Sequence, residues 1–145
     1  MSPGSRKIFL AVAILSAIGL VVSSVSLAHH YGHSKTEYCD FGQAFNCDMV
    51  NRSIYSSVMG IPVALIGLLG YEALLMLATK FRDRSQTPSM LLAAGVAGLS
   101  FALYLTYVEA YVLAVWCILC LSSLTVIVLI TILSGVLFLR RKSSL

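Results

Sequence analysis

Four long apolar stretches constrain this chain more than any other feature. A helix needs roughly 20 mostly apolar residues to cross the ~30 Å hydrocarbon core of a bilayer. We expect spans over four segments, at about 8–28, 58–79, 88–108 and 113–139. The 145 residues then leave room only for short connections and one longer loop at about 29–57. The sequence therefore predicts an all-α membrane protein, a four-helix transmembrane bundle that forms a single domain over residues 1–145.

The composition excludes several other classes of protein. Only 11% of the residues are charged and 59% are hydrophobic, whereas soluble domains carry roughly 25% charged residues. Such a chain has too few polar side chains to cover a soluble globule, and it is too apolar to be disordered. Its net charge of +4 reflects how the chain is oriented in the membrane, not binding to nucleic acid.

The first apolar segment has a second interpretation, as a cleaved signal peptide. Ser26-Leu27-Ala28 resembles a small-residue cleavage site. The apolar stretch is, however, longer than the roughly 7 to 15 residues of a usual signal core, which favours a retained span.

Basic residues predict the orientation, because cytoplasmic segments are enriched in Lys and Arg. Eight of the ten basic residues flank the same side of the predicted spans: Arg6, Lys7, Lys80, Arg82, Arg84, Arg140, Arg141 and Lys142. Both termini are therefore expected in the cytoplasm, while the 29–57 loop and a tight turn at Glu109–Tyr111 face the outside. Either interpretation of the first segment gives this orientation.

Four cysteines lie on the predicted outer side. Cys117 and Cys120 are three residues apart at the start of the last span, the spacing of dithiol/disulfide centres. The positive end of a helix favours the thiolate that attacks disulfides. Two structural cysteines, or half of a metal site, are the alternatives. A second cysteine pair in the same oxidising compartment favours redox chemistry.

Cys39 and Cys47 form that second pair, in a loop segment broken by Gly42 and polar residues. Such a loop can carry a thiol between an external partner and the inner pair. A plain structural disulfide between Cys39 and Cys47 is the alternative. The following segment, Asp48–Val58, has apolar residues interspersed among polar ones, which predicts a short amphipathic lid helix on the outer surface. A lid there would enclose an apolar cavity beside the inner pair, suited to a lipid-soluble electron acceptor.

Taken together, these motifs resemble the vitamin K epoxide reductase family, in the manner of a short prokaryotic member, over essentially the whole chain. The motifs that carry the resemblance are Cys39-x7-Cys47, Ser53 six residues later, Gly60-Ile61-Pro62 before the second span, and Cys117-Ile118-Leu119-Cys120.

The resemblance implies a four-helix bundle around a quinone of the menaquinone, ubiquinone or vitamin K type. It implies that Cys120 is nearest the quinone and that Cys117 is its resolving partner. Cys47 would attack the disulfide of that pair, and Cys39 would meet a separate thioredoxin-like thiol protein outside the membrane. In bacterial relatives this flow of electrons makes disulfides, in the cytoplasmic (inner) membrane.

The chain departs from the vertebrate members at two quinone-binding positions. Their asparagine and tyrosine correspond here to Ser56 and Leu124, neither of which reproduces the original hydrogen-bonding group. The resemblance thus assigns quinone contacts to Cys120, Ser53, Ser56 and Leu124. Disulfide formation is therefore expected as the function, with reduction of vitamin K quinone or its epoxide as the alternative.

Two other functions remain open on sequence alone. One is a membrane protein that handles metal or haem, with ligands from the cysteines and from His29, His30 and His33 near the outer loop. The spacing of these histidines follows no common ligand pattern, and we therefore expect no bound metal. The other alternative is a structural membrane adapter stapled by disulfides.

Overall fold

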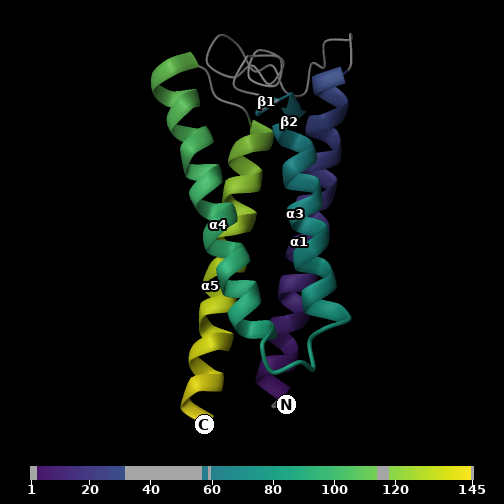
Figure 1. The fold of residues 1–145 in the computed structure, drawn as a ribbon, viewed down its shortest axis with the longest axis vertical. Helices are drawn as coiled ribbons and strands as arrows, with labels where there is room; N and C mark the ends of the chain where they lie inside the picture. Colours follow the sequence, from purple (N-terminus) through teal and green to yellow (C-terminus); the bar gives the residue numbers. More distant parts are fainter. Residues whose placement is uncertain (1–2, 32–56, 59, 114–117, 145) are drawn as a thin grey trace.

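The protein was analysed as a computed structural model that describes residues 3–31, 57–58, 60–113 and 118–144. Within these ranges the chain forms four long α-helices that run along a common direction (Figure 1). They are α1 (Pro3–Tyr31), α3 (Val63–Thr79), α4 (Thr87–Tyr107) and α5 (Ile118–Ser144). The predicted all-α membrane bundle is confirmed.

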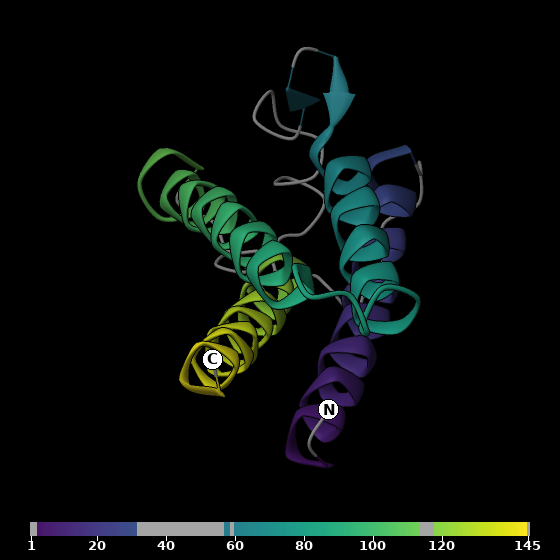
Figure 2. The same cartoon turned by 60° about the horizontal axis from the view of Figure 1, so that its bottom comes forward.

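The helices associate as two pairs. α1 packs along α3, and α4 packs along α5, while contacts between α1 and α5 join the two pairs (Figure 2). Both chain ends and the 80–86 connection lie at one end of the bundle, which we call the terminal end (Figure 1). We call the opposite end, where α3 and α5 begin, the ribbon end.

A small β-ribbon precedes α3. Strands β1 (Ser57–Val58) and β2 (Ile61–Pro62) pair antiparallel, and Gly60 in the turn between them has a φ of +83°. Glycine adopts this left-handed conformation without the clash that a Cβ would cause. Pro62 is extended at the N-cap of α3, with a φ of −60° and a ψ of +135°.

The ribbon corrects two sequence predictions. The second helix begins at Val63 instead of Val58, because Gly60 and the extended Pro62 interrupt the helical path. The last two residues of the predicted lid helix, Ser57 and Val58, belong to strand β1. The rest of that lid, residues 48–56, lies outside the described residues.

The connection between α3 and α4 is short and internally bonded. The Thr87 hydroxyl donates a hydrogen bond to the Phe81 backbone carbonyl, and the Arg84 guanidinium lies 4.7 Å from the centroid of the Phe81 ring. Thr87 is fully buried, and Pro88 follows it in the first turn of α4, where its missing N–H costs no helical bond.

The predicted tight turn at Glu109–Tyr111 is wrong. α4 continues directly into a π-helix, η2 (Val108–Leu113). No glycine or proline breaks the helix there, and the Tyr107 and Tyr111 rings contact each other with their centroids 5.1 Å apart. The connection to α5 is thereby moved to residues 114–117, outside the described residues.

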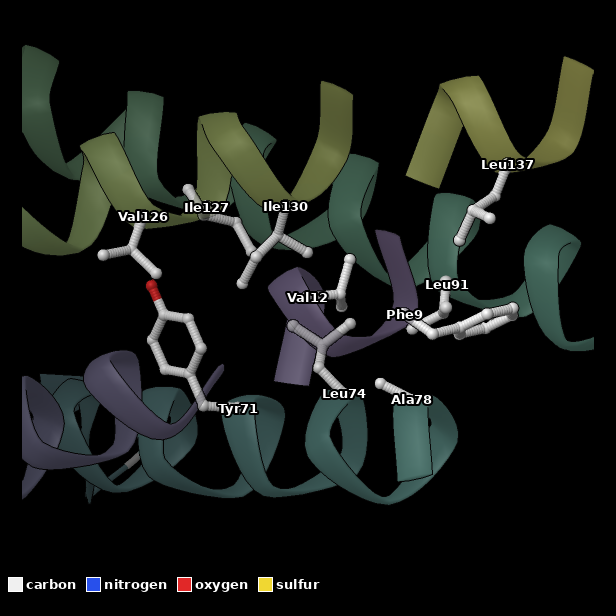
Figure 3. Close-up of a cluster of buried hydrophobic side chains, with 10 residues drawn as sticks. All are labelled: Phe9, Val12, Tyr71, Leu74, Ala78, Leu91, Val126, Ile127, Ile130 and Leu137. Atoms are coloured by element: carbon white, nitrogen blue, oxygen red, sulfur yellow. The ribbon is translucent and has the colours of Figure 1, made fainter. Parts of the chain in front are cut away.

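Buried hydrophobic side chains from the four described helices form one cluster (Figure 3), and by residue number they lie toward the terminal end of the bundle. Its buried members are Phe9, Val12, Tyr71, Leu74, Ala78, Leu91, Val126, Ile127, Ile130 and Leu137. On α3 and α5 these residues begin at Tyr71 and Val126 and continue toward the terminal end. The first eight residues of α3 (63–70) and the first eight of α5 (118–125) contain no fully buried side chain. The core thus stops at the level of Tyr71.

Large apolar side chains also cover the outside of the bundle. On α1, Leu10, Ile14, Ile18 and Val21 form an exposed stripe at helical spacing, and each of the other three helices carries similar residues. Among the residues that the structure describes, three helices are long and apolar enough to cross a membrane, and α3 is a shorter apolar helix of 17 residues. A surface of this kind requires lipid around it, so the chain is an integral membrane protein.

Candidate functional site

Cys120 lies in the first turn of α5, near the ribbon end of the bundle. Its side chain is half-buried. The first turn of a helix carries a partial positive charge, which favours negatively charged groups such as a thiolate. The position at the start of the helix therefore favours the thiolate form of this cysteine.

Ser123 and Leu124 share one face of α5 with Cys120, since residues three and four apart are neighbours on a helix. Leu124 is half-buried and packs against the core. Its side chain offers no hydrogen-bond donor, and it therefore cannot replace the tyrosine that vertebrate members have at this position. The face that carries Cys120 turns toward the interior, because Ser123 bonds a residue on the opposite side of the bundle.

That residue is Tyr71 of α3. Its hydroxyl lies 3.0 Å from the Ser123 backbone carbonyl and 2.8 Å from the Ser123 Oγ. Figure 3 shows the ring extending from α3 with its oxygen toward α5. The pair lies one helical turn from Cys120 and at the level where the buried core ends. Two hydroxyl groups therefore meet inside the bundle, one helical turn from the cysteine.

Gly19 of α1 completes this arrangement. A Cβ at position 19 would overlap the Tyr71 ring at Cδ1, Cε1 and Cγ, so only glycine leaves room for the ring in its observed position. Tyr71 is 5% exposed, which places it among the most buried side chains of α3. Three helices thus meet at one tyrosine.

Most of the predicted site residues lie outside the described residues: Cys39, Cys47, Ser53, Ser56 and Cys117. Of the predicted set, the structure describes Cys120 and Leu124 and brings them onto one face of α5. The predicted roles of all seven residues remain predictions. His29 and His30 belong to the last turn of α1, and within the described ranges no group of three or more His, Cys, Asp or Glu residues forms a metal site.

The residues present around Cys120 are chemically suited to a quinone. A quinone is a flat apolar ring with two carbonyl oxygens, and it accepts two electrons and two protons. The ribbon-end halves of α3 and α5 supply apolar side chains that are half-buried or exposed, together with the Cys120 thiol. Sites for small apolar ligands have this character, with a mostly apolar lining and a few polar groups.

Sequence reasoning missed Tyr71, Ser123 and Gly19. One signal was available, because a tyrosine within an apolar span needs a partner for its hydroxyl. The identity of that partner depends on which helices lie across from each other, and no pattern in the sequence reports this.

Comparison with known proteins agrees with the motifs. Residues 10–135 match the family described as "Vitamin K epoxide reductase family", which covers most of the chain. A search of curated proteins found no match.

Proposed function

The chain belongs to the vitamin K epoxide reductase family, and from this premise we propose that it is a membrane dithiol:quinone oxidoreductase that supports disulfide formation. Membership establishes a membrane oxidoreductase of the quinone- and disulfide-linked type. The observation that carries the finer proposal is the position of Cys120, half-buried on the interior face of α5 where the core ends.

The proposed relay uses two cysteine pairs in sequence. Cys39 exchanges with the thiols of a separate thioredoxin-like protein, so that the partner becomes oxidised and the Cys39–Cys47 pair reduced. Cys47, as thiolate, then attacks the disulfide between Cys117 and Cys120 and resolves with Cys39. When the inner pair closes again it releases two electrons and two protons. A bound quinone supplies the acceptor for both, and the membrane pool carries them away as quinol.

Leu124 supports disulfide formation over epoxide reduction. The leucine packs against the core and cannot donate a hydrogen bond to a carbonyl or epoxide oxygen. The thiol relay needs no such donor. We assign quinone contacts to Cys120 and Leu124, and to Ser53 and Ser56 of the preceding loop.

The orientation follows from charge. Basic residues gather at the terminal end, where both termini and the 80–86 connection lie, and Cys120 lies near the opposite end. Because positive charge is retained on the cytoplasmic side, we place the terminal end in the cytoplasm and Cys120 on the periplasmic face of a prokaryotic inner membrane.

The deciding experiment is complementation in a bacterium that lacks its own membrane thiol oxidase. The redox state of its periplasmic thioredoxin-like oxidant is followed by alkylation and gel shift. We expect the oxidant to be largely oxidised when the chain is expressed and reduced when the Cys120→Ala variant is expressed at the same level. If the oxidant stays reduced with the unaltered chain, while its membranes reduce vitamin K epoxide with added dithiol, epoxide reduction is the function instead.

A further inference from the structure

We propose that Tyr71 is a positioning residue, whose hydroxyl bonds Ser123 and thereby fixes the turn of α5 that carries Cys120. The inference deepens the proposed function and rests on it, since the alignment of Cys120 matters for its exchange with Cys117 and for electron transfer to the quinone.

The beginning of α5 is packed less completely than the rest of the helix. Residues 118–125 contain no buried side chain, and the first buried one is Val126. α3 and α5 are not one of the closely packed helix pairs. The bond from Tyr71 to Ser123 crosses this interior and ties the start of α5 to α3, three residues from Cys120.

The hydrogen-bond inventory favours a tie between helices over a ligand contact. The Tyr71 O–H donates to the Ser123 carbonyl, and the Ser123 Oγ–H can donate to the Tyr71 oxygen, so that each proton has an acceptor inside the pair. Neither hydroxyl then needs a ligand to satisfy it. The pair stabilises one position of the α5 turn because breaking it leaves the Tyr71 hydroxyl inside the bundle without the partner that satisfies it.

The contact between the Tyr71 ring and Gly19 also supports a positioning role for Tyr71. Gly19 leaves space that the Tyr71 ring fills, so α1 fixes the direction in which the hydroxyl points. Disulfide exchange depends on which sulfur is attacked and from where, and small misplacements lower the rate of a reaction between oriented groups. We therefore expect a rotation of the α5 turn to misalign the Cys120 sulfur with Cys117 and with the quinone.

The first test compares Tyr71→Phe with Tyr104→Phe. Both changes remove one phenol oxygen, but Tyr104 is 53% exposed on α4 and serves as the matched control. In the full-length protein with all its cysteines, we expect Tyr71→Phe to lower dithiol:quinone turnover by about 3- to 10-fold, the range for losing about one hydrogen bond. The KM for the quinone should stay within twofold, whereas Tyr104→Phe should leave both values unchanged.

The second readout does not need any turnover. In a background with Cys39, Cys47 and Cys117 replaced by Ser, the alkylation rate of Cys120 by N-ethylmaleimide reports how well its turn is held. Tyr71→Phe should raise this rate by about 3- to 10-fold, since a looser turn exposes the sulfur more often. A cysteine placed at Leu133 in a cysteine-free chain reports loosening elsewhere in α5, and its rate should not change.

A third variant moves the ring and keeps both hydroxyl groups. Gly19→Ala should shift Tyr71 and reproduce the effects of Tyr71→Phe, while Gly70→Ala, where a Cβ meets nothing within 4 Å, should have no effect. Because both changes act on the same bond, the double variant Gly19→Ala/Tyr71→Phe should lose less than the sum of the two single losses.

The outcomes separate this inference from the proposed function. If Tyr71→Phe behaves like Tyr104→Phe in alkylation, or if the Leu133 probe reacts faster by the same factor as Cys120, Tyr71 does not position Cys120 and the inference is overturned. If the unaltered chain reduces no quinone with any dithiol, the proposed function fails. The alkylation comparison still decides the role of Tyr71 in that case.

Discussion

Gly95 of α4 lies against Thr131 of α5 so closely that a Cβ at position 95 would be 2.9 Å from the Thr131 Oγ1 and 3.3 Å from its Cα. Part of this contact is with backbone, which cannot move aside as a flexible side chain does. Close approach through small residues is a common way for helices to associate in lipid, where no hydrophobic force drives them together. We expect the pairing of α4 with α5 to depend on this contact.

Gly95→Leu should therefore destabilise the protein by roughly 1–3 kcal/mol, the usual range for overpacking. Thermal unfolding in detergent should show a lower midpoint. Gly70→Leu is the matched control, because position 70 is exposed and open, and its midpoint should not fall. Equal midpoints for the two variants would show that α4 and α5 do not rely on close approach at Gly95.

Thr87 offers a second test of stability. Thr87→Val keeps the shape of the side chain but removes its hydrogen bond to the Phe81 carbonyl, at a fully buried position. We expect a loss of about 1–3 kcal/mol, the cost of an unsatisfied buried group. Thr79→Val removes an exposed hydroxyl that bonds only its own helix and should cost much less. Similar unfolding midpoints for the two valine variants would contradict this account of the 80–86 connection.

The two cysteine pairs should differ in what they need from the reductant. Cys120→Ala should abolish turnover with every reductant. Cys39→Ala should block exchange with the protein partner but keep part of the turnover with a small dithiol, which can reach the inner pair directly. Initial rates with both reductants test this, and equal loss in the two variants with the small dithiol argues against the division of labour.

Labelling of intact cells tests the orientation. After reduction, a membrane-impermeant maleimide should modify Cys39 if the terminal end faces the cytoplasm, as we propose from the basic residues. A cysteine introduced at Ser85, an exposed position in the connection at the terminal end, should react only after lysis. The reverse pattern would mean that the topology is inverted.

The first helix should remain part of the mature protein. Phe9 and Val12 of α1 belong to the buried core, and the Tyr71 ring packs against Gly19, so removing α1 would expose part of the core and the Tyr71 ring. An N-terminal epitope tag should therefore stay on the protein isolated from membranes, at the mass of the uncleaved chain. Detection of a stable, active form that starts near His29 would instead identify a cleaved signal peptide.

The sequence was sufficient for the helices because lipid demands long apolar segments, and their length is directly visible. Helix starts were predictable where they coincide with a break in the apolar pattern, as at Pro88, one residue from the observed start at Thr87. The start of α3 was placed five residues too early, because Val58 is apolar and its strand pairing with Ile61 depends on the backbone conformation at Gly60.

The site was predictable only as far as local spacing reaches. Cys120 and Leu124 share a face because four residues make about one helical turn, a rule that sequence alone supplies. The bond from Tyr71 to Ser123 joins residues 52 positions apart, and it depends on how α1 holds two other helices across the bundle. The π-helix at Val108–Leu113 was missed for a related reason, since no residue type marks where a helix admits one extra residue per turn.

The shared location of the two chain ends has a consequence for fusion proteins. α5 contains 27 residues and is about 40 Å long, and Cys120 lies at the end of it that is remote from both termini. In the proposed orientation, a thiol-disulfide domain joined directly to Leu145 would therefore be delivered to the side of the membrane opposite Cys120, however long its linker. A fusion that adds one further crossing would bring such a domain to the side on which Cys120 lies.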